Sequence, residues 1–245
     1  MTQIEGSLRG IAPLANITLA DRAITRAMER AEHLPGMVEF HGPSGWGKSI
    51  AANYVANRYR AYYVQAKSVW TKKAFLLAIL KEMGIKPAGT LSEMLDQIAE
   101  QLATSGRPLI VDEMDHIVDK NAVELVRDIY ESSFAPILLI GEEGLPHKLK
   151  KFERFHGRIL DWVAAAPVSI EDARALSELY CSRVKVADDL LEKLVEIAHG
   201  SVRRVCVNLE MIQEKTLADG QDEIDLSAWG SRELYRGEAP KARRV

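Results

Sequence analysis

The chain has 245 residues, of which 47% are hydrophobic and 27% are charged. These fractions are close to those of average globular proteins, so they exclude an intrinsically disordered or low-complexity chain. The formal net charge of -3, from 32 basic and 35 acidic residues, excludes a protein that binds nucleic acid through overall positive charge. Any contact with DNA would therefore require a local basic patch.

Residue spacing argues against metal sites, disulfides and membrane spans. The two cysteines, Cys181 and Cys206, form no Cys-x-x-Cys or Cys/His pattern, so neither a zinc site nor a disulfide framework is predicted. The six histidines have no metal-ligand spacing either. No leader of the basic-then-apolar type and no run of 18 apolar residues occurs, so we expect a cytoplasmic protein without a membrane span.

The chain alternates between apolar runs and helical periodicity up to residue 167. Residues 1–17 are expected to be a leader or linker. Strands are predicted at 37–41, 62–64, 108–111, 136–140 and 159–163, and helices at 18–33, 49–58, 72–83, 92–103 and 121–132. This order predicts an α/β domain over residues 18–167, with a parallel sheet between two layers of helices.

The pattern changes after Pro167, beyond which no further strand is expected. Helical periodicity at 169–182, 187–198 and 202–217 predicts a small helical lid over residues 168–218. Residues 219–245 are expected to contain a short helix around 226–235 and then a basic tail with Lys241, Arg243 and Arg244.

A glycine-rich loop follows the first predicted strand and opens the next helix. It matches the phosphate-loop pattern G-x-x-x-x-G-K-[ST] in full, with Gly42, Pro43, Ser44, Gly45, Trp46, Gly47, Lys48 and Ser49. Glycines let main-chain N–H groups turn toward phosphate oxygens, and the helix N-terminus adds a positive dipole end. Lys48 is expected to contact the β- and γ-phosphates, and the Ser49 hydroxyl to ligate Mg²⁺. A chance glycine turn is the alternative, which the strand before it and the helix after it disfavour.

Two carboxylates end the apolar run at 108–111. Ligands gather at the carboxyl ends of parallel strands, so we expect Asp112 to hold Mg²⁺ and Glu113 to polarise the water that attacks the γ-phosphate. A solvated acidic turn is the alternative. With Asp115 the segment also looks like the D-E-x-D box of helicases, but those need a second motor domain, and the residues that follow are too few and too helical to form one.

With these motifs the chain resembles the AAA+ ATPases over about residues 12–218. The segment Gly200-Ser201-Val202-Arg203 is similar to the G-[DS]-x-R element of initiator- and loader-type members. The resemblance implies a P-loop NTPase fold of the AAA+ type with a helical lid, and it makes Arg203 the sensor 2 arginine that reaches the nucleotide phosphates. An ordinary helix with two surface arginines is the alternative.

Within that superfamily, the segment 138–145 resembles the L-[IV]-G-x-x-x-L stretch of the DNA-transposition ATPases of the MuB and TnsC type, and of the related secretion ATPase ExeA. Arg158-Ile159 is similar to the R-[IV] that follows it in those proteins. The resemblance implies an arginine finger donated to a neighbouring subunit, for which Arg158 is slightly preferred and Arg154 stays open; a solvated basic face is the alternative. Sensor 1 would fall near Gly141-Glu142, where the Asn, Ser or Thr usual in the family is missing.

Lysines after the second strand are the candidate DNA contacts. In relatives that encircle DNA this region lines the central channel, and here it carries Lys67, Lys72 and Lys73. A lysine pair at a helix start opposes the helix dipole, which suggests an external anion, although plain surface lysines are an equal alternative. Trp70 beside them either stacks or packs. The aromatic residues Tyr54, Tyr59, Tyr62 and Tyr63 are predicted to pack rather than to stack on bases.

Taken together, the motifs and the resemblance lead to a functional hypothesis. They imply an ATP- and Mg²⁺-dependent ATPase that forms a ring or helical filament on double-stranded DNA, marks target DNA and activates a transposase. Such a protein would belong to a phage or mobile element and act in the cytoplasm of a bacterial host. The alternative is an ExeA-like ATPase that acts on a protein assembly without binding DNA.

Overall fold

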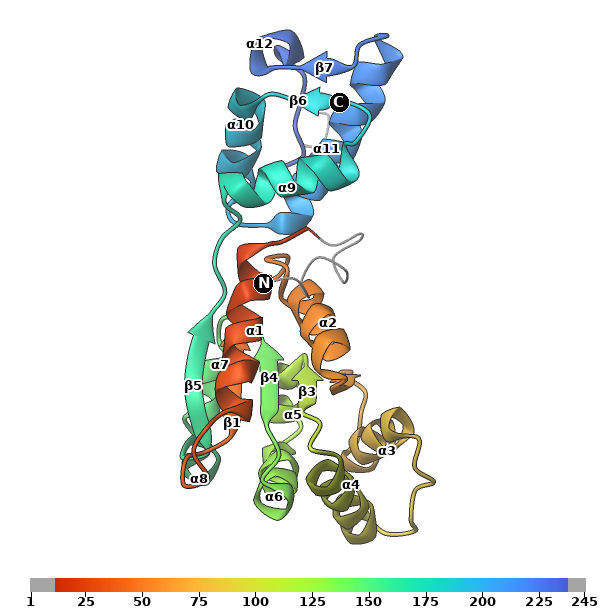
Figure 1. The fold of residues 1–245 in the computed structure, drawn as a ribbon, viewed down its shortest axis with the longest axis vertical. Helices are drawn as coiled ribbons and strands as arrows, with labels where there is room; N and C mark the ends of the chain where they lie inside the picture. The colour runs from red at the N-terminus through yellow and green to blue at the C-terminus, as the bar shows by residue number, and fades with distance from the viewer. Residues whose placement is uncertain (1–11, 238–245) are drawn as a thin grey trace, which may run out of the picture. The chain divides into compact units, whose positions relative to one another are not determined.

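The computed structural model describes residues 12–237 (Figure 1). The predicted basic tail with Lys241, Arg243 and Arg244 lies outside the described residues, as does most of the predicted leader. The described chain forms two compact units. We call residues 16–43 and 48–165 the sheet unit, and residues 12–15, 44–47 and 166–237 the helical unit.

The sheet unit contains five parallel strands in the order β2-β3-β4-β1-β5. They are β1 (Met37–His41), β2 (Tyr62–Gln65), β3 (Leu109–Asp112), β4 (Ile137–Gly141) and β5 (Ile159–Ala164). All five predicted strands are confirmed. The central strands β3 and β4 are buried along their whole length, which is why their sequences are continuous apolar runs rather than alternating ones.

Helices cover both faces of this sheet. One face packs against α3 (Lys72–Met83), α4 (Leu91–Ser105) and α6 (Val123–Ser133) in a single apolar cluster. Because side chains alternate along a strand, Val38, Phe40 and Ile110 point to the other face. The buried faces of α1 (Ala15–Met28) and α2 (Lys48–Tyr59) cover this other face of the sheet. The predicted three-layer α/β fold is therefore confirmed.

Some predicted boundaries are wrong. Helix α1 runs from Ala15 to Met28 rather than over 18–33, because the chain turns before the strand that follows. Three short helices escaped prediction: α5 (Met114–Asp119), α7 (Leu145–Leu149) and α8 (Glu153–His156). Each has at most six residues, fewer than two turns, so it shows little periodicity.

The helical unit is built around α9 (Ile170–Tyr180), α10 (Asp188–Ala198) and α11 (Val202–Ala218). The expectation of no strand after Pro167 is wrong, since β6 (Lys185–Val186) and β7 (Glu223–Ile224) pair in parallel. Two residues are too short for an alternating pattern, so only the pairing reveals these strands. The helix expected around 226–235 is also too long, because α12 spans only Leu226–Trp229.

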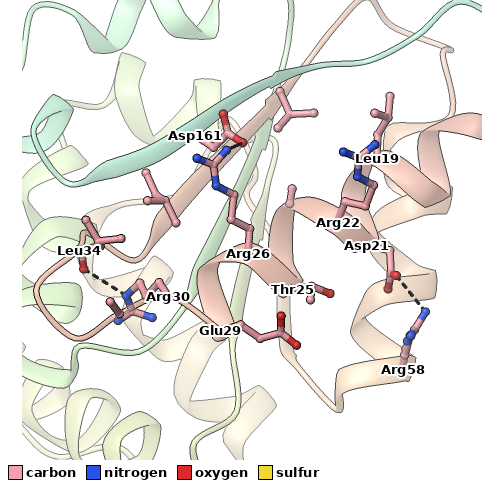
Figure 2. Close-up of a pocket in the computed structure, with 14 residues that line it drawn as sticks. Leu19, Asp21, Arg22, Thr25, Arg26, Glu29, Arg30, Leu34, Arg58 and Asp161 are labelled. Carbon is pink, nitrogen blue, oxygen red and sulfur yellow. Dashed lines mark hydrogen bonds and ion pairs between the residues drawn. The ribbon is translucent and has the colours of Figure 1, made fainter.

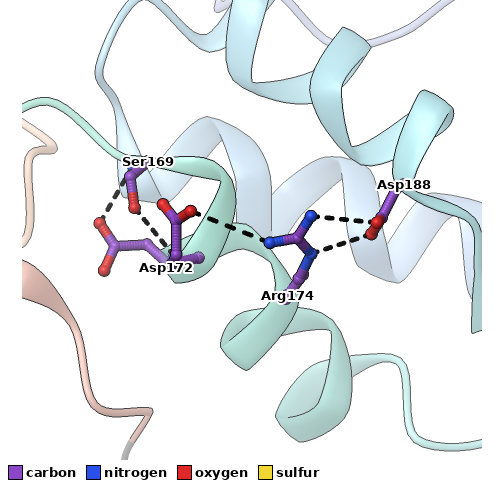
Figure 3. A network of polar contacts seen from close by, with 5 residues as sticks. Ser169, Asp172, Arg174 and Asp188 are labelled. Atoms are coloured by element: carbon purple, nitrogen blue, oxygen red, sulfur yellow. Dashed lines mark hydrogen bonds and ion pairs between the residues drawn. The ribbon is translucent and has the colours of Figure 1, made fainter.

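A polar network fixes the first helix of this unit (Figure 3). The Ser169 hydroxyl accepts the Asp172 N–H, and an Asp172 oxygen accepts the Ser169 N–H at 3.0 Å, which together form a capping box. The Arg174 guanidinium donates twice to Asp188, at 3.0 Å each, and so ties α9 to α10. The cap starts α9 at Ile170, three residues after Pro167.

Among residues 12–237, no helix combines the length and the apolar character that crossing a membrane requires.

The capping box predicted at Thr90 and Glu93 is present in the structure, with the Thr90 hydroxyl accepting the Glu93 N–H at 3.2 Å. Substituting Thr90 by Ala removes this bond, so we expect the free energy of unfolding to fall by about 1 kcal/mol. Urea denaturation followed by circular dichroism measures it. The control Thr104→Ala, at the exposed end of the same helix, should change it by less than about 0.5 kcal/mol; equal effects would contradict the role of the cap.

Candidate functional site

The carboxyl edge of the sheet brings three of the predicted motifs together. Since the strands are parallel, the segments that follow β1, β3 and β4 leave from the same edge. The glycine-rich loop follows β1, Asp112 and Glu113 end β3, and Gly141 ends β4. Residues that are nearly a hundred positions apart in the sequence thus lie at one edge of the sheet.

Some positions of the glycine-rich loop have a backbone conformation that favours glycine, and one has little room for a side chain. Gly45 and Gly47 have φ angles of 84° and 90°, in the left-handed region that favours glycine. Gly42 is buried, and a Cβ placed on it would lie 2.7 Å from the Cβ of Ala165. The sequence pattern therefore reflects backbone requirements of the loop itself.

Residues 44–47 of this loop pack within the helical unit, against the start of α11. The main-chain N–H of Arg203 donates to the Gly45 carbonyl at 3.2 Å, and the Ser201 hydroxyl lies 3.4 Å from the same oxygen. A Cβ on Gly200 would lie 2.5 Å from the Trp46 ring. The Arg203 side chain is exposed and forms no ion pair with another described residue. The predicted sensor 2 segment thus contacts the predicted phosphate loop through the main chain.

Lys48 and Ser49 begin helix α2, where the positive end of the helix dipole lies. The Lys48 ammonium is half-buried and donates to the carbonyls of Gly42 and Pro43, at 2.6 and 3.0 Å. Burial lowers the pKa of Lys48, while the charges of Glu113 and other nearby carboxylates raise it. The lysine is therefore held at the loop by the backbone and faces the acidic end of β3.

Asp112 is a buried carboxylate, only 2% exposed, whose two oxygens both accept hydrogen bonds. The Glu113 N–H donates to Oδ1 and the Tyr63 hydroxyl donates to Oδ2, each at 2.9 Å. Burial and the negative charge of Asp112 raise the pKa of Tyr63, so this hydroxyl stays protonated. Tyr63 was expected to pack only, and the sequence offered no signal for its bond to a residue 49 positions away.

Glu113 has a strained backbone and a half-buried carboxylate. Its φ and ψ of 56° and 41° are left-handed, which costs a non-glycine residue about 1–2 kcal/mol. Its side chain is half-buried and accepts no hydrogen bond from another described residue. Burial and the neighbouring Asp112 charge raise the pKa of Glu113. A carboxylate with a raised pKa and no hydrogen bond from another described residue suits a proton acceptor.

Gly141 ends β4 in a crowded position. A Cβ on it would lie 2.4 Å from the Leu145 side chain and 2.5 Å from an oxygen of Asp115, so a side chain there would require these neighbours to shift. Asp115 accepts the N–H of Glu142 at 2.7 Å and pairs with the Lys148 ammonium at 3.0 Å. The last acid of the D-E-x-D segment is therefore structural: it joins α5 to the end of β4 and to α7.

The donor set at this edge fits a magnesium nucleotide. Mg²⁺ prefers oxygen ligands and usually takes one or two protein oxygens plus phosphate and water, as the Ser49 hydroxyl and the Asp112 carboxylate would supply. Among residues 12–237 no cluster of three or more His, Cys, Asp or Glu side chains is arranged to hold a metal by itself. A metal here would accordingly depend on the phosphates of a nucleotide for its remaining ligands.

The candidate DNA lysines lie near the same edge, after the outer strand β2. Lys67, Lys72 and Lys73 are exposed, and none forms an ion pair with another described residue. The first turn of α3 contains two of them and no acid. The Lys67 ammonium lies 6.0 Å from the ring centre of Trp70, which itself packs on the apolar cluster beneath α3.

The two candidate finger arginines lie at the opposite edge of the sheet. Arg158 directly precedes β5, whose first residue pairs with Met37, the first residue of β1. The five residues of β1 span roughly 16 Å, so Arg158 lies that far from the end of β1 that Gly42 follows. Arg158 pairs with Glu131, whereas the exposed Arg154 has no ion-pair partner in the described part of the chain.

A cavity of about 830 Å³ between α1 and β5 is a less suitable site (Figure 2). Four arginines line it, but Arg26 pairs with Asp161 and Arg58 pairs with Asp21. Arg30 donates to main-chain carbonyls. Because three acidic residues, Asp21, Glu29 and Asp161, also line the cavity, little net positive charge is left there to attract a phosphate.

A buried acid–histidine pair lies on β1, just before the phosphate loop. Glu39 is fully buried, and its Oε2 lies 2.6 Å from Nδ1 of His41, while Oε1 has no hydrogen-bond partner among the described residues. Burial raises the pKa of Glu39 to about 7, and the hydrogen bond to Glu39 raises the pKa of His41. A glutamate within the apolar run Met-Val-Glu-Phe is a signal for a buried polar pair. The sequence analysis did not use that signal and so did not predict the pair.

The fold defines the class of protein. A parallel sheet ordered β2-β3-β4-β1-β5, with a glycine-rich loop after β1 and acidic residues at the end of β3, fits the P-loop NTPase fold. Residues 31–149 match the family model of the AAA domain. No curated protein matches the chain in sequence.

Solved structures with the same fold include archaeal and bacterial proteins. The Aeropyrum pernix ORC2 protein in ADPNP-ADP complexes is 16% identical with a TM-score of 0.64, over 87% of this chain and 65% of that one. The Aeropyrum pernix ORC1 protein in complex with DNA is 16% identical with a TM-score of 0.63, over 87% and 62%. The Thermotoga maritima RuvB Holliday junction branch migration motor is 17% identical with a TM-score of 0.59, over 87% and 65%. The chain thus spans less than two thirds of the length of each.

The Glu39–His41 pair predicts a pH dependence of stability. Native Glu39 keeps its proton up to about pH 7, and the unfolded chain keeps it only to about pH 4.5, so raising the pH between these values favours unfolding. The raised pKa of His41 acts in the same direction. We expect the free energy of unfolding to fall by about 1–3 kcal/mol from pH 5 to pH 8, measured by urea denaturation, and Glu39→Gln to remove most of this slope.

The charges that face the pair are Asp115 and Lys48 around Glu39, and Glu143 and Lys48 around His41. The control Glu29→Gln, at an exposed position directly after α1, should keep the wild-type slope. A wild-type slope in Glu39→Gln as well would contradict the assignment.

Proposed function

We propose that this chain binds ATP with Mg²⁺ at the carboxyl edge of the sheet unit and hydrolyses it. The observation that carries the proposal is the convergence of Lys48, Ser49, Asp112 and Glu113 at one edge. Lys48 would contact the β- and γ-phosphates, while Ser49 and Asp112 hold the metal. The metal, when bound, neutralises the charge that develops on the phosphates.

Glu113 is the proposed group that orients and deprotonates the attacking water. Its carboxylate is free of hydrogen bonds from other described residues, and its pKa is raised by burial and by Asp112. A base with a raised pKa accepts a proton more readily than an ordinary surface carboxylate. Lys48 and Asp112 both interact electrostatically with Glu113, so it lies within the same charged cluster as the residues that would hold the phosphates.

Two arginines are proposed to complete the site. Arg203, which follows the N-cap of α11, is proposed as sensor 2 because its main chain already contacts Gly45. Arg158 and Arg154 are the candidates for the finger donated to a neighbouring subunit. Arg158 pairs with Glu131, whereas Arg154 forms no ion pair with another described residue, which favours Arg154. The guanidinium of arginine is permanently charged, and its paired N–H groups match phosphate oxygens. Because a neighbouring subunit would donate this arginine, hydrolysis would require an oligomer.

Double-stranded DNA is the proposed partner of that oligomer. The support is the group Lys67, Lys72 and Lys73, which forms no ion pairs among the described residues in a chain of net charge -3. A ring or helical filament would repeat this weak patch once per subunit and so raise the total affinity for DNA. The similarity in fold to an ORC1 protein solved with DNA and to a branch migration motor is compatible with this partner.

The finer proposal is a role in DNA transposition, in which the ATP-bound oligomer marks target DNA and activates a transposase. It rests on the resemblance of residues 138–145 and Arg158-Ile159 to MuB- and TnsC-type ATPases, and it implies a phage or mobile element in a bacterial host. An ExeA-like ATPase that acts on a protein assembly is the second candidate. Stimulation of ATPase activity by duplex DNA separates the two.

Two substitutions test the nucleotide site. Lys48→Ala should weaken ATP binding about 30-fold or more, because removing a half-buried charge from its partners costs about 2–5 kcal/mol. Glu113→Gln should keep ATP affinity within a few-fold of wild type and slow hydrolysis by about 10²–10⁴-fold, because it removes only the base. Fluorescent-nucleotide titration and phosphate release measure the two effects.

The control for this pair is Glu100→Gln, an exposed glutamate on α4 that should leave both properties unchanged. Hydrolysis at the wild-type rate by Glu113→Gln would show that Glu113 is not the base. Undiminished ATP binding by Lys48→Ala would refute the site.

The DNA proposal predicts a change in salt dependence. Replacing Lys72 and Lys73 by Ala should weaken ATP-dependent binding to duplex DNA and flatten the plot of log affinity against log salt by about 2 per subunit, since each lost phosphate contact removes about 0.9. Electrophoretic mobility shift or anisotropy at several salt concentrations measures it.

The matched control is the double Ala variant of Lys81 and Lys86, two exposed lysines near the other end of the same helix that change the net charge equally. An equal loss of slope in the control would attribute the effect to net charge rather than to this patch. Absence of any DNA binding by the wild type with ATP at low salt would favour the protein-directed alternative.

A further inference from the structure

Tyr63 connects the outer strand β2 to the carboxylate at the end of β3. Its hydroxyl donates to Oδ2 of Asp112 at 2.9 Å. An ionised carboxylate has no hydrogen to give, so the tyrosine must be the donor. In the strand register Tyr63 pairs with Ile110 and Gln65 pairs with Asp112, so the ring of Tyr63 spans one side-chain repeat to reach the carboxylate.

The same strand also holds the main chain of Asp112. The Ala66 N–H, directly after β2, donates to the Asp112 carbonyl at 2.9 Å. The Glu113 N–H donates to Oδ1, also at 2.9 Å. Thus each carboxylate oxygen has one donor, and the carboxyl plane is fixed by groups on both sides.

This arrangement leaves acceptor capacity on the carboxylate. Each of its two oxygens has two lone pairs, of which the bonds from Tyr63 and Glu113 use one apiece. Asp112 is almost completely buried, so an unsupported carboxylate at this position would be free to rotate and would lose a hydrogen bond that water cannot replace. The remaining lone pairs point in directions that the two donors determine.

We propose that Tyr63 is a positioning residue that orients Asp112 for Mg²⁺. The inference rests on the proposed function, because it assumes that Asp112 holds the metal of a bound nucleotide. Groups that hydrogen-bond a metal-binding carboxylate fix its orientation, and their loss typically weakens metal binding about 10–100-fold. Tyr63 itself contacts neither nucleotide nor metal in this role.

The test compares nucleotide binding with and without the metal. In Tyr63→Phe, a fluorescent ATP analogue in EDTA should bind within about twofold of wild type, because Lys48 and the loop are unchanged. The Mg²⁺ concentration that gives half of the metal-dependent gain in affinity should rise about 10–100-fold. Tyr59→Phe is the matched control: it removes a hydroxyl that contacts Thr25 and Asp21, and should leave the Mg²⁺ requirement unchanged.

A double-mutant cycle separates positioning from a general loss of structure. In the Asp112→Asn background, Tyr63→Phe should add little to the Mg²⁺ requirement, because the group that it orients is already altered. The double variant also removes the buried charge that Tyr63→Phe leaves short of a donor, so it stays measurable if the single variant folds poorly.

The outcomes distinguish this inference from the proposed function. A Tyr63→Phe protein with the wild-type Mg²⁺ requirement overturns the role of Tyr63 alone. Equal effects of Tyr63→Phe with and without Asp112→Asn overturn the route through Asp112. A wild-type protein that binds no nucleotide, or gains nothing from Mg²⁺, overturns the proposed function and this role with it.

Discussion

The parallel pairing of β4 with both β1 and β3 is the constraint on which the site depends. Because these three strands run in one direction, the phosphate loop, the Asp112-Glu113 pair and Gly141 all leave from the same edge. Shifting one strand by a single residue would turn its buried side chains to the other face, so the apolar clusters that hold the register also hold the site.

Several charged side chains are partly or fully buried at that edge, whereas an apolar core normally excludes charge. Burial alone disfavours the ammonium of Lys48 and the carboxylates of Asp112 and Glu113, and each is stabilised by the others or by main-chain groups. Asp115 contributes differently, since it satisfies the N–H after β4 and pairs with Lys148. Neutralising one member therefore changes the energetics of the rest, as expected for charges that share a desolvated site.

The fold is compatible with more functions than the candidate site is. Structures at 16–17% identity share this architecture, and a fold of this kind serves many functions. The candidate functions differ in what they require of the surface of the sheet unit. That surface carries three lysines after β2 that form no ion pair with another described residue, and an exposed Arg154 at the far edge. Both features bear on function only under the proposal that several copies of the chain assemble.

The sequence by itself determined the five strands, the glycine-rich loop after the first and the acidic end of the third, whose role in binding a nucleotide stays a prediction. Their signals are local: a continuous apolar run, a glycine at a left-handed position, a lysine at a helix start. It missed β6 and β7, the bond from Tyr63 to Asp112, the lock between Asp115 and the end of β4, and the pairing that buries Glu39 with His41. Most of these depend on contacts between residues about 30 to 50 positions apart. Only the tertiary structure decided them, because the spacing of residues along the sequence does not show which strands become neighbours.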